Sequence, residues 1–269
     1  MASLVTEQGV VHYEAYGRGR PVLLLHGWLN SWEVWRSSTL VLGEEFRVYA
    51  LDFLGFGDSG DQAKEFSVRN FVLMVDEFME RMGIVKAPLV GHSMGGTVSL
   101  SAALRRPDKV TKVIVIGSPI QGKSLSPLLR LAAYRGWVTV GEKAPGLYRL
   151  FQSLFIPFLR VYTHTMAKDG RALGKMLTSD VSKLDYAPFF ESITTLRQTD
   201  LTSQIGALTI PVMGIYGKRD NIVHPGQSKV LKQALPHSEI AWFEDSGHFP
   251  MMDESQRFHE TVRRFLNGG

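Results

Sequence analysis

Three residues of the chain could together carry out acyl transfer: Ser93, Asp220 and His248. A serine hydroxyl is a weak nucleophile near neutral pH, so it needs a base that takes its proton and an acid that holds this base in the right tautomer. Ser93 lies in the segment G-H-S-M-G, which matches the pattern G-x-S-x-G of a nucleophile on a sharp turn between a strand and a helix. The order serine, aspartate, histidine accompanies such turns, and it predicts a catalytic triad.

The residues around Ser93 favour this turn. A short apolar run follows Pro88, and the apolar residues after Gly96 recur at helical spacing, so the segment predicts a strand, a turn and a helix. Gly91 and Gly95 lack side chains at the positions where strand and helix pass close to one another. We therefore expect the Ser93 hydroxyl to be exposed at the carboxyl edge of a sheet.

Acyl transfer also needs hydrogen-bond donors for the negative charge that develops on the substrate oxygen. The helix after Ser93 places its first free N–H groups and the positive end of its dipole beside the serine. We expect an oxyanion hole formed by the backbone N–H of Met94, directly after the nucleophile, and that of Trp28, which follows His26 and Gly27.

The other two members of the triad each follow a predicted strand: Asp220 follows I-P-V-M-G-I-Y-G, and His248 follows E-I-A-W-F. In a parallel sheet the carboxyl ends of the strands lie on one edge, so both side chains can meet Ser93 there. Two other carboxylates compete with Asp220. These are Asp200 and Asp245, and Asp245 lies three residues from His248, where a turn former is expected.

Other polar segments near these motifs have structural interpretations. His26 and His92 lie inside tight motifs, and we expect a structural role for both. The segment G-F-G-D-S-G at 55–60 spells G-x-G-x-x-G, a pattern of dinucleotide-binding loops, but the next helix does not begin before Ser67, which argues against a nucleotide. The histidines and carboxylates show no metal-ligand spacing, so the sequence predicts neither a metal nor a cofactor.

Strands and helices alternate along most of the chain, which predicts an α/β fold with a mostly parallel, doubly wound sheet. Residues 121–187 interrupt this alternation with a helical, strand-poor region. We therefore expect a core domain of residues 1–120 and 188–269 with a helical lid at 121–187. Besides the segment around Ser93, the expected strands are an edge strand at 10–16 and strands at 21–25, 46–51, 110–117, 210–217 and 239–243, and the expected helices include 67–82, one that ends at 235, and 253–266.

Composition narrows the class of protein. A chain of 269 residues is long enough for one large α/β domain with a well-buried core. It contains no cysteine, which excludes disulfides, thiolate catalysis and cysteine-bound metals. The N-terminus lacks a basic region followed by an apolar core, and no apolar window approaches the ~20 residues that span a bilayer. We therefore expect a cytoplasmic protein, without nucleic acid as a partner.

Along essentially its whole length the chain resembles the α/β-hydrolase superfamily. Four motifs carry the resemblance: H-G-W, D-F-L-G-F-G-D-S-G, G-H-S-M-G-G, and G-K-R-D followed 28 residues later by S-G-H. The resemblance implies a lid inserted after the strand that ends at Gly117, and a two-step acyl transfer through a serine-bound acyl group. The leading hypothesis is a serine hydrolase that cleaves a carboxylic ester with a hydrophobic acyl or aromatic group. The alternatives are a carbon-carbon bond hydrolase, which usually has asparagine where this chain has His92, and a non-catalytic ligand-binding member of the same fold.

Two further features bear on partners. The segment H-G-W-L-N-S-W-E-V-W resembles the start of pimeloyl-carrier-protein methyl ester esterases. Residues 121–187 contain ten basic and four acidic side chains, a net charge of +6, interleaved with Leu, Phe, Tyr and Trp. Three interpretations of this charge remain open: a solvated outer face, docking onto an anionic membrane surface, and docking onto an acidic acyl-carrier protein.

Overall fold

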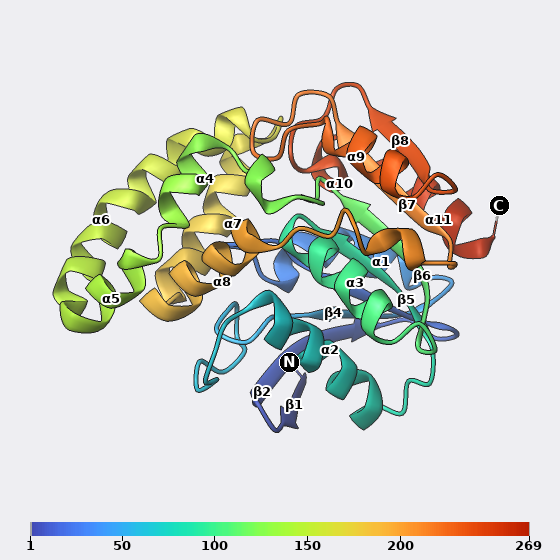
Figure 1. The fold of residues 1–269 in the computed structure, drawn as a ribbon, viewed down its shortest axis with the longest axis horizontal. Helices are drawn as coiled ribbons and strands as arrows, with labels where there is room; N and C mark the ends of the chain where they lie inside the picture. The colour runs from blue at the N-terminus through green and yellow to red at the C-terminus, as the bar shows by residue number, and fades with distance from the viewer. Residues whose placement is uncertain (1, 269) are drawn as a thin grey trace.

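An eight-stranded sheet forms the centre of the protein (Figure 1). The computed structural model describes residues 2–268. The strand order is β1-β2-β4-β3-β5-β6-β7-β8; β1 and β2 run antiparallel to their neighbours, and the pairs from β4 to β8 are parallel. This confirms the predicted α/β fold with a mostly parallel sheet. The strands are β1 Ala2–Thr6, β2 Gly9–Tyr16, β3 Pro21–Leu25, β4 Arg47–Leu51, β5 Ala87–His92, β6 Val110–Ile116, β7 Val212–Gly217 and β8 Glu239–Phe243.

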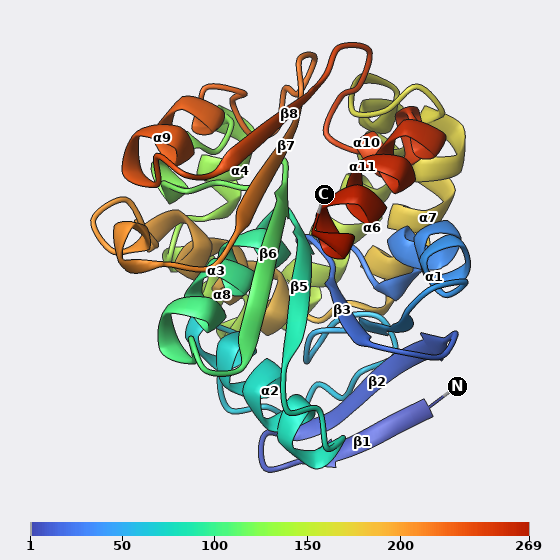
Figure 2. The same cartoon turned by 90° about the vertical axis from the view of Figure 1, so that its right-hand side faces the viewer.

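Helices cover both faces of this sheet, which explains why β3 and the last four residues of β6, 113–116, are continuous apolar runs with buried side chains. In Figure 2 the helices α2, α3 and α9 lie on one face, and α1 and α11 lie on the other. The helix α2 begins where the sequence predicts, because Ser67 Oγ accepts a hydrogen bond from the N–H of Asn70 at 3.2 Å and so caps its first turn. These helices are α1 Arg36–Leu42, α2 Val68–Arg81, α3 Met94–Arg105, α9 Gln227–Ala234 and α11 Ser255–Asn267, and the short helix α10 Pro250–Asp253 precedes α11.

Five helices lie between β6 and β7, and together they form one end of the molecule (Figure 1). They occupy the region that the sequence predicts to be helical and poor in strands. The predicted boundary at residues 187 and 188 falls within the first turn of the last of them. Its helices are α4 Pro127–Ala132, α5 Gly136–Lys143, α6 Pro145–Tyr162, α7 Gly170–Lys183 and α8 Tyr186–Gln198.

Two details differ from the sequence predictions. The strand β2 is not at the edge, because β1 pairs with it through a hairpin and takes the edge position. An alternation of apolar and polar residues does not by itself distinguish an edge strand from a strand that pairs on both sides. The closing helix begins at Ser255 and not at Asp253, since a separate short turn, α10, precedes it. Among residues 2–268, no helix has both the length and the apolar character needed to span a membrane.

Candidate active site

Ser93 occupies a strained turn between β5 and α3. Its backbone has φ 52° and ψ −118°, and only one other residue besides glycine in the described chain, Leu29, has a positive φ. A side chain on Gly91 would overlap the backbone of Gly95, and one on Gly95 would overlap the carbonyl of Leu25. Strand and helix therefore pass too close for any residue but glycine at these two positions. Strain of this kind is concentrated at functional sites, where the surrounding structure holds it in place.

Asp220 and His248 form a buried hydrogen-bonded pair at the carboxyl ends of β7 and β8. The distance from His248 Nδ1 to Asp220 Oδ2 is 2.8 Å. The other carboxylate oxygen, Oδ1, accepts hydrogen bonds from the backbone N–H groups of Ile222 at 2.8 Å and Val223 at 3.0 Å. With the aspartate ionised, Nδ1 carries the proton, and the Nε2 of a neutral ring is left as the proton acceptor.

The backbone of Gly117 lies close to this pair, and a side chain at this position would crowd it. Gly117 follows β6 with φ 52°, and a Cβ on it would lie 3.1 Å from His248 Nδ1 and 3.2 Å from Asp220 Oδ2. The His92 ring lies beside the His248 ring, with the two centroids 4.7 Å apart. Ser93 and His248 both line one cavity. The structure thus brings the three predicted residues to the same edge of the sheet.

The two rival carboxylates lie in other hydrogen-bond networks. Asp200 Oδ1 accepts a hydrogen bond from the N–H of Thr202 at 3.0 Å, and Asp245 pairs with Arg219 at 2.7 Å. Neither forms a hydrogen bond or ion pair with His248 among the described residues.

The two other histidines of the site region make backbone hydrogen bonds. His26 Nε2 accepts the N–H of Phe53 at 2.9 Å, and His92 Nε2 donates to the carbonyl of His248 at 2.9 Å. Burial lowers the pKa of His26 and holds that of His92 well below the ordinary value, so both rings are neutral near pH 7. These contacts support the predicted structural roles.

The two residues predicted to form the oxyanion hole lie close to Ser93 in different elements. Met94 is the first residue of α3, whose N-terminal N–H groups lack partners within the helix. Trp28 lies in the loop after β3, where a Cβ on the preceding Gly27 would come within 3.0 Å of the Ser93 Cβ. Within residues 2–268, neither of these two N–H groups forms a backbone hydrogen bond.

The cavity beside Ser93 has a volume of about 490 Å³. Its wall consists mainly of leucine, phenylalanine and tryptophan side chains, and most of them come from the helical insertion. Two of the polar atoms in the wall are already hydrogen bonded: Trp28 Nε1 donates to the carbonyl of Phe189 at 2.9 Å, and the Tyr148 hydroxyl donates to that of Leu184 at 2.8 Å. The cavity therefore suits an apolar group.

Residues 20–255 match a protein family whose description is "alpha/beta hydrolase fold". The chain belongs to the α/β-hydrolase family. A pimeloyl-[acyl-carrier protein] methyl ester esterase of Vibrio parahaemolyticus is 30% identical over 267 residues, which cover 95% of this chain and 97% of that protein. This likeness supports a hydrolase of the esterase type.

Solved structures share the fold at lower identity. An enol-lactonase from Burkholderia xenovorans superposes with a TM-score of 0.82 at 19% identity, covering 99% of this chain and 100% of that one. An esterase from Exiguobacterium antarcticum gives a TM-score of 0.81 at 20% identity, covering 97% of this chain and 96% of that one.

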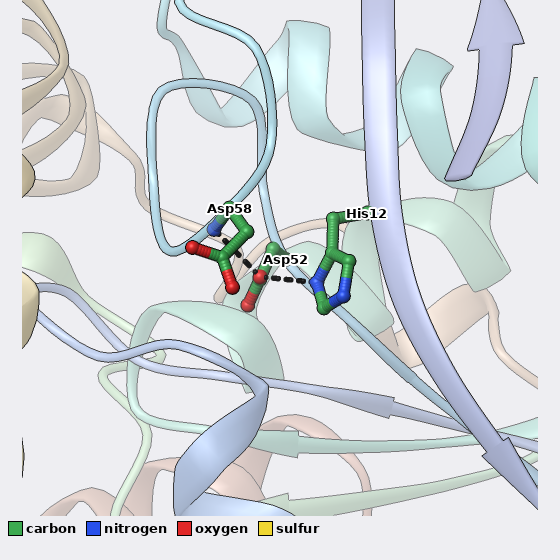
Figure 3. Close-up of side chains that lie close together, drawn as sticks. All are labelled: His12, Asp52 and Asp58. Atoms are coloured by element: carbon green, nitrogen blue, oxygen red, sulfur yellow. Dashed lines mark hydrogen bonds and ion pairs between the residues drawn. The ribbon is translucent and has the colours of Figure 1, made fainter. Parts of the chain in front are cut away.

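In this α/β hydrolase a fully buried carboxylate, Asp52, organises the loop after β4 (Figure 3). Its Oδ2 lies 2.7 Å from His12 Nδ1 and accepts the N–H of Asp58 at 3.0 Å, while Oδ1 accepts the N–H of Trp32 at 2.6 Å. The hydrogen bond to Asp52 raises the pKa of His12. The side chains of His12, Asp52 and Asp58 lie close enough together to hold a metal ion. Their positions are, however, explained by these hydrogen bonds and by the ion pair between Asp58 and Lys183.

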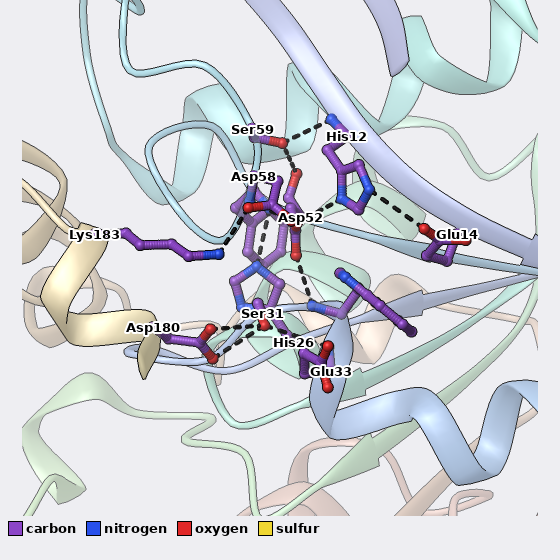
Figure 4. A network of polar contacts seen from close by, with 12 residues as sticks. His12, Glu14, His26, Ser31, Glu33, Asp52, Asp58, Ser59, Asp180 and Lys183 are labelled. Carbon is purple, nitrogen blue, oxygen red and sulfur yellow. Dashed lines mark hydrogen bonds and ion pairs between the residues drawn. The ribbon is translucent and has the colours of Figure 1, made fainter. Parts of the chain in front are cut away.

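Two polar contacts join the helical insertion to the loops of the core (Figure 4). Ser31 Oγ lies 3.0 and 3.1 Å from the two carboxylate oxygens of Asp180 on α7, and Lys183 Nζ lies 2.7 Å from Asp58 Oδ1. Burial raises the pKa of Asp180 to about 7, against the opposing effect of the Ser31 hydroxyl. The charge on Asp52 adds to the rise, and Lys183 opposes it. The sequence analysis missed this contact because its partners are far apart in the chain and belong to no motif.

Asp180→Asn is expected to make the thermal stability less dependent on pH. Folding raises the pKa of Asp180 from its ordinary value of 3.8 to about 7, so the stabilisation is fully present below the ordinary value and is lost as the pH rises through about 7. Between pH 5 and pH 8.5 the native protein should lose on the order of 1–3 kcal/mol of unfolding free energy through this group. Thermal unfolding followed by circular dichroism at both pH values measures the difference. Glu142→Gln, at an exposed position on α5, is the control and should keep the native pH dependence; an unchanged pH dependence in Asp180→Asn would contradict the assignment.

Proposed function

We propose that this protein is a serine esterase that cleaves carboxylic esters with a hydrophobic acyl or aromatic group. Ser93 is the nucleophile, His248 the general base and acid, and Asp220 the group that orients the histidine. The observation that carries the proposal is the buried Asp220–His248 pair beside an apolar cavity whose wall also contains Ser93. The division into a core of residues 1–120 and 188–269 and a lid of residues 121–187 is part of the same proposal.

In the first half of the reaction, Ser93 Oγ attacks the ester carbonyl carbon while His248 Nε2 takes the hydroxyl proton. The negative charge on the carbonyl oxygen is stabilised by the N–H groups of Trp28 and Met94. When the tetrahedral intermediate collapses, the bond to the alcohol oxygen breaks and the imidazolium donates its proton to that oxygen. The alcohol leaves, and the acyl group remains on Ser93.

In the second half, a water molecule attacks the acyl carbon while His248 takes one of its protons. The intermediate then collapses, the Ser93 oxygen leaves and regains the proton from the imidazolium, and the carboxylic acid is released. In both halves the Asp220 carboxylate stabilises the transient positive charge of the imidazolium, since it accepts the Nδ1 proton in a buried hydrogen bond.

The substrate class follows from the cavity wall. An acyl chain or aromatic ring is stabilised by transfer from water into an apolar cavity, by about 0.8 kcal/mol for each buried methylene group. The Vibrio relative is named for a methyl ester of a carrier-bound acyl chain, which is an ester of this kind. A carrier-bound ester is therefore a candidate substrate beside small hydrophobic esters, and the basic insertion would attract an anionic partner.

A series of p-nitrophenyl esters from acetate to decanoate tests the proposal. We expect kcat/KM to rise by up to about fourfold for each added methylene until the chain exceeds the cavity, as the transfer energy of a methylene predicts. Ser93→Ala, assayed beside the native protein, should be inactive on every ester. The absence of hydrolysis of any ester by the native protein would favour a carbon-carbon bond hydrolase or a binding protein of the same fold, and would refute the proposal.

A further inference from the structure

The helical insertion exposes a large set of apolar side chains. Elsewhere in the described chain, exposed large apolar residues are few and scattered, as on most soluble proteins. On α4, α5 and α6 they follow one another along neighbouring helices, and exposed apolar surface of this extent marks an interaction site. We define the apolar ridge by these residues: Leu128, Leu131, Tyr134, Trp137, Val140, Leu147, Leu150, Phe151, Leu154, Phe158 and Val161.

On α6 the ridge forms a stripe along one face. Leu147, Leu150, Leu154 and Val161 are 55%, 57%, 68% and 72% exposed, and their spacing of three, four and seven residues places them on neighbouring positions of the helix surface. The face that carries Leu159 is buried against the rest of the insertion. Because α6 is amphipathic yet leaves its stripe uncovered, the fold itself supplies no partner for these side chains.

The ridge is continuous with the cavity. Seven of the eleven ridge residues also line the cavity that contains Ser93, whereas Tyr134, Leu150, Leu154 and Val161 do not. The seven are Leu128, Leu131, Trp137, Val140, Leu147, Phe151 and Phe158. An apolar chain that lies against the ridge could thus pass into the cavity along apolar side chains and without crossing water.

Positive charge borders the ridge. Residues 121–165 contain six basic side chains and one acidic one, Glu142, a net charge of +5. Arg149 and Arg160 are exposed and stand next to Leu150 and Val161 in the sequence, so they lie about 100° around α6 from the stripe. Among the ion pairs of residues 2–268, none involves the six cations of this segment, which are Lys123, Arg130, Arg135, Lys143, Arg149 and Arg160.

We propose that α4, α5 and α6 dock on the surface of an anionic lipid membrane, with the apolar ridge among the acyl chains and the bordering cations at the head groups. Helices that lie in a membrane interface typically combine leucine, phenylalanine and tryptophan with lysine and arginine. In Figure 1, α5 and α6 lie at the end of the molecule away from β8, and α7 and α8 pack against the insertion from the side of the core. This inference rests on the proposed esterase function, because docking would deliver membrane-dissolved esters to Ser93.

Two other occupants fit the surface less well. A second copy of this chain would bring an identical cationic segment against the first, and like charges that face one another oppose association. An acidic protein would satisfy the cations, but it would also need an apolar groove to cover the ridge on three helices, whereas a lipid layer adapts to any shape. The membrane satisfies both the charge and the apolar surface.

Sedimentation with vesicles tests the proposal. The native protein and Ser93→Ala should both bind vesicles of phosphatidylglycerol and phosphatidylcholine, bind vesicles of pure phosphatidylcholine weakly, and be released from the anionic vesicles by high salt. The triple variant Leu150→Ser, Leu154→Ser, Val161→Ser should bind at least about tenfold more weakly, and so should Arg149→Gln combined with Arg160→Gln. None of these three apolar residues lines the cavity, so hydrolysis of soluble p-nitrophenyl butyrate by the triple variant should equal that of the native protein.

Val85→Ser is the matched control, because Val85 is 78% exposed and lies outside the insertion. It should bind vesicles like the native protein. Equal vesicle binding by the native protein and the triple variant would overturn the proposal, as would binding to an acidic carrier protein without binding to vesicles. The proposal would also be overturned, in favour of self-association, if light scattering showed that the native protein is a dimer and the triple variant a monomer, and if the native protein did not bind vesicles. Soluble-ester hydrolysis reports on the esterase separately, so failure of docking with hydrolysis intact refutes only this inference.

Discussion

Replacing Ser93 by alanine is expected to lower kcat on a hydrophobic ester by on the order of 10³-fold or more. The substitution removes the hydroxyl oxygen on which we propose that the acyl intermediate forms, while the cavity and the backbone donors stay in place. His248→Ala should have an effect of the same size, because the two residues act as a unit and the loss of either abolishes the same step. The double variant should therefore be little slower than either single variant.

Initial rates on p-nitrophenyl butyrate measure this effect, and thermal unfolding shows whether each variant is folded. The control is Ser101→Ala, a half-buried serine in α3 whose hydroxyl donates to the carbonyl of Thr97 at 2.8 Å. It should keep nearly native activity. Activity in Ser93→Ala above a few per cent of the native value would mean that Ser93 is not the nucleophile.

Asp220→Asn is also expected to lower kcat by on the order of 10³-fold, through the tautomer of His248. The Oδ1 of Asp220 accepts two backbone N–H groups, so an asparagine in its place keeps its oxygen there and turns its NH₂ towards His248 Nδ1. The amide can only donate to Nδ1, which forces the proton onto Nε2. With Nε2 protonated, the ring cannot take the proton of Ser93.

The matched variants Asp200→Asn and Asp245→Asn test the rival assignments. Both aspartates lie in networks apart from His248, so each variant should retain most of the native activity. KM should change little in Asp220→Asn, because the carboxylate is separated from the substrate by the histidine. A larger loss of kcat in Asp245→Asn than in Asp220→Asn would contradict the account.

Much of the fold could be predicted because local sequence and final structure agree. The residues of β3 and residues 113–116 of β6 form continuous apolar runs, as burial on both faces requires, and Ser67 caps α2 where its apolar periodicity begins. The position of β2 could not be predicted in the same way. Apolar and polar residues can alternate both in an edge strand and in a strand that pairs on both sides. The sequence analysis predicts no strand at Ala2–Thr6, so the partner that takes the edge position was missing from the prediction.

The candidate triad could be found from the sequence because each member follows a strand, and the ends of parallel strands share one edge. The cavity wall could not be found, since its residues come from five helices whose packing depends on tertiary contacts. The contact between Ser31 and Asp180 shows the same limit: its partners are 149 residues apart, and only the folded chain brings them together. The sequence shows that basic and apolar residues are interleaved in residues 121–187, but it does not show which apolar side chains stay exposed, because apolar residues on a helix usually face the core.

The central claim is that Ser93 is a nucleophile activated by His248. Labelling with a fluorophosphonate, followed by peptide mass spectrometry, tests it most directly, because an activated serine oxygen displaces fluoride from phosphorus and keeps the phosphonyl group. We predict one label per chain, on the peptide that contains Ser93, with labelling at least about 10³-fold slower in His248→Ala and absent in Ser93→Ala. A protein that stays unlabelled, or a label on another residue that persists in Ser93→Ala, would contradict the account.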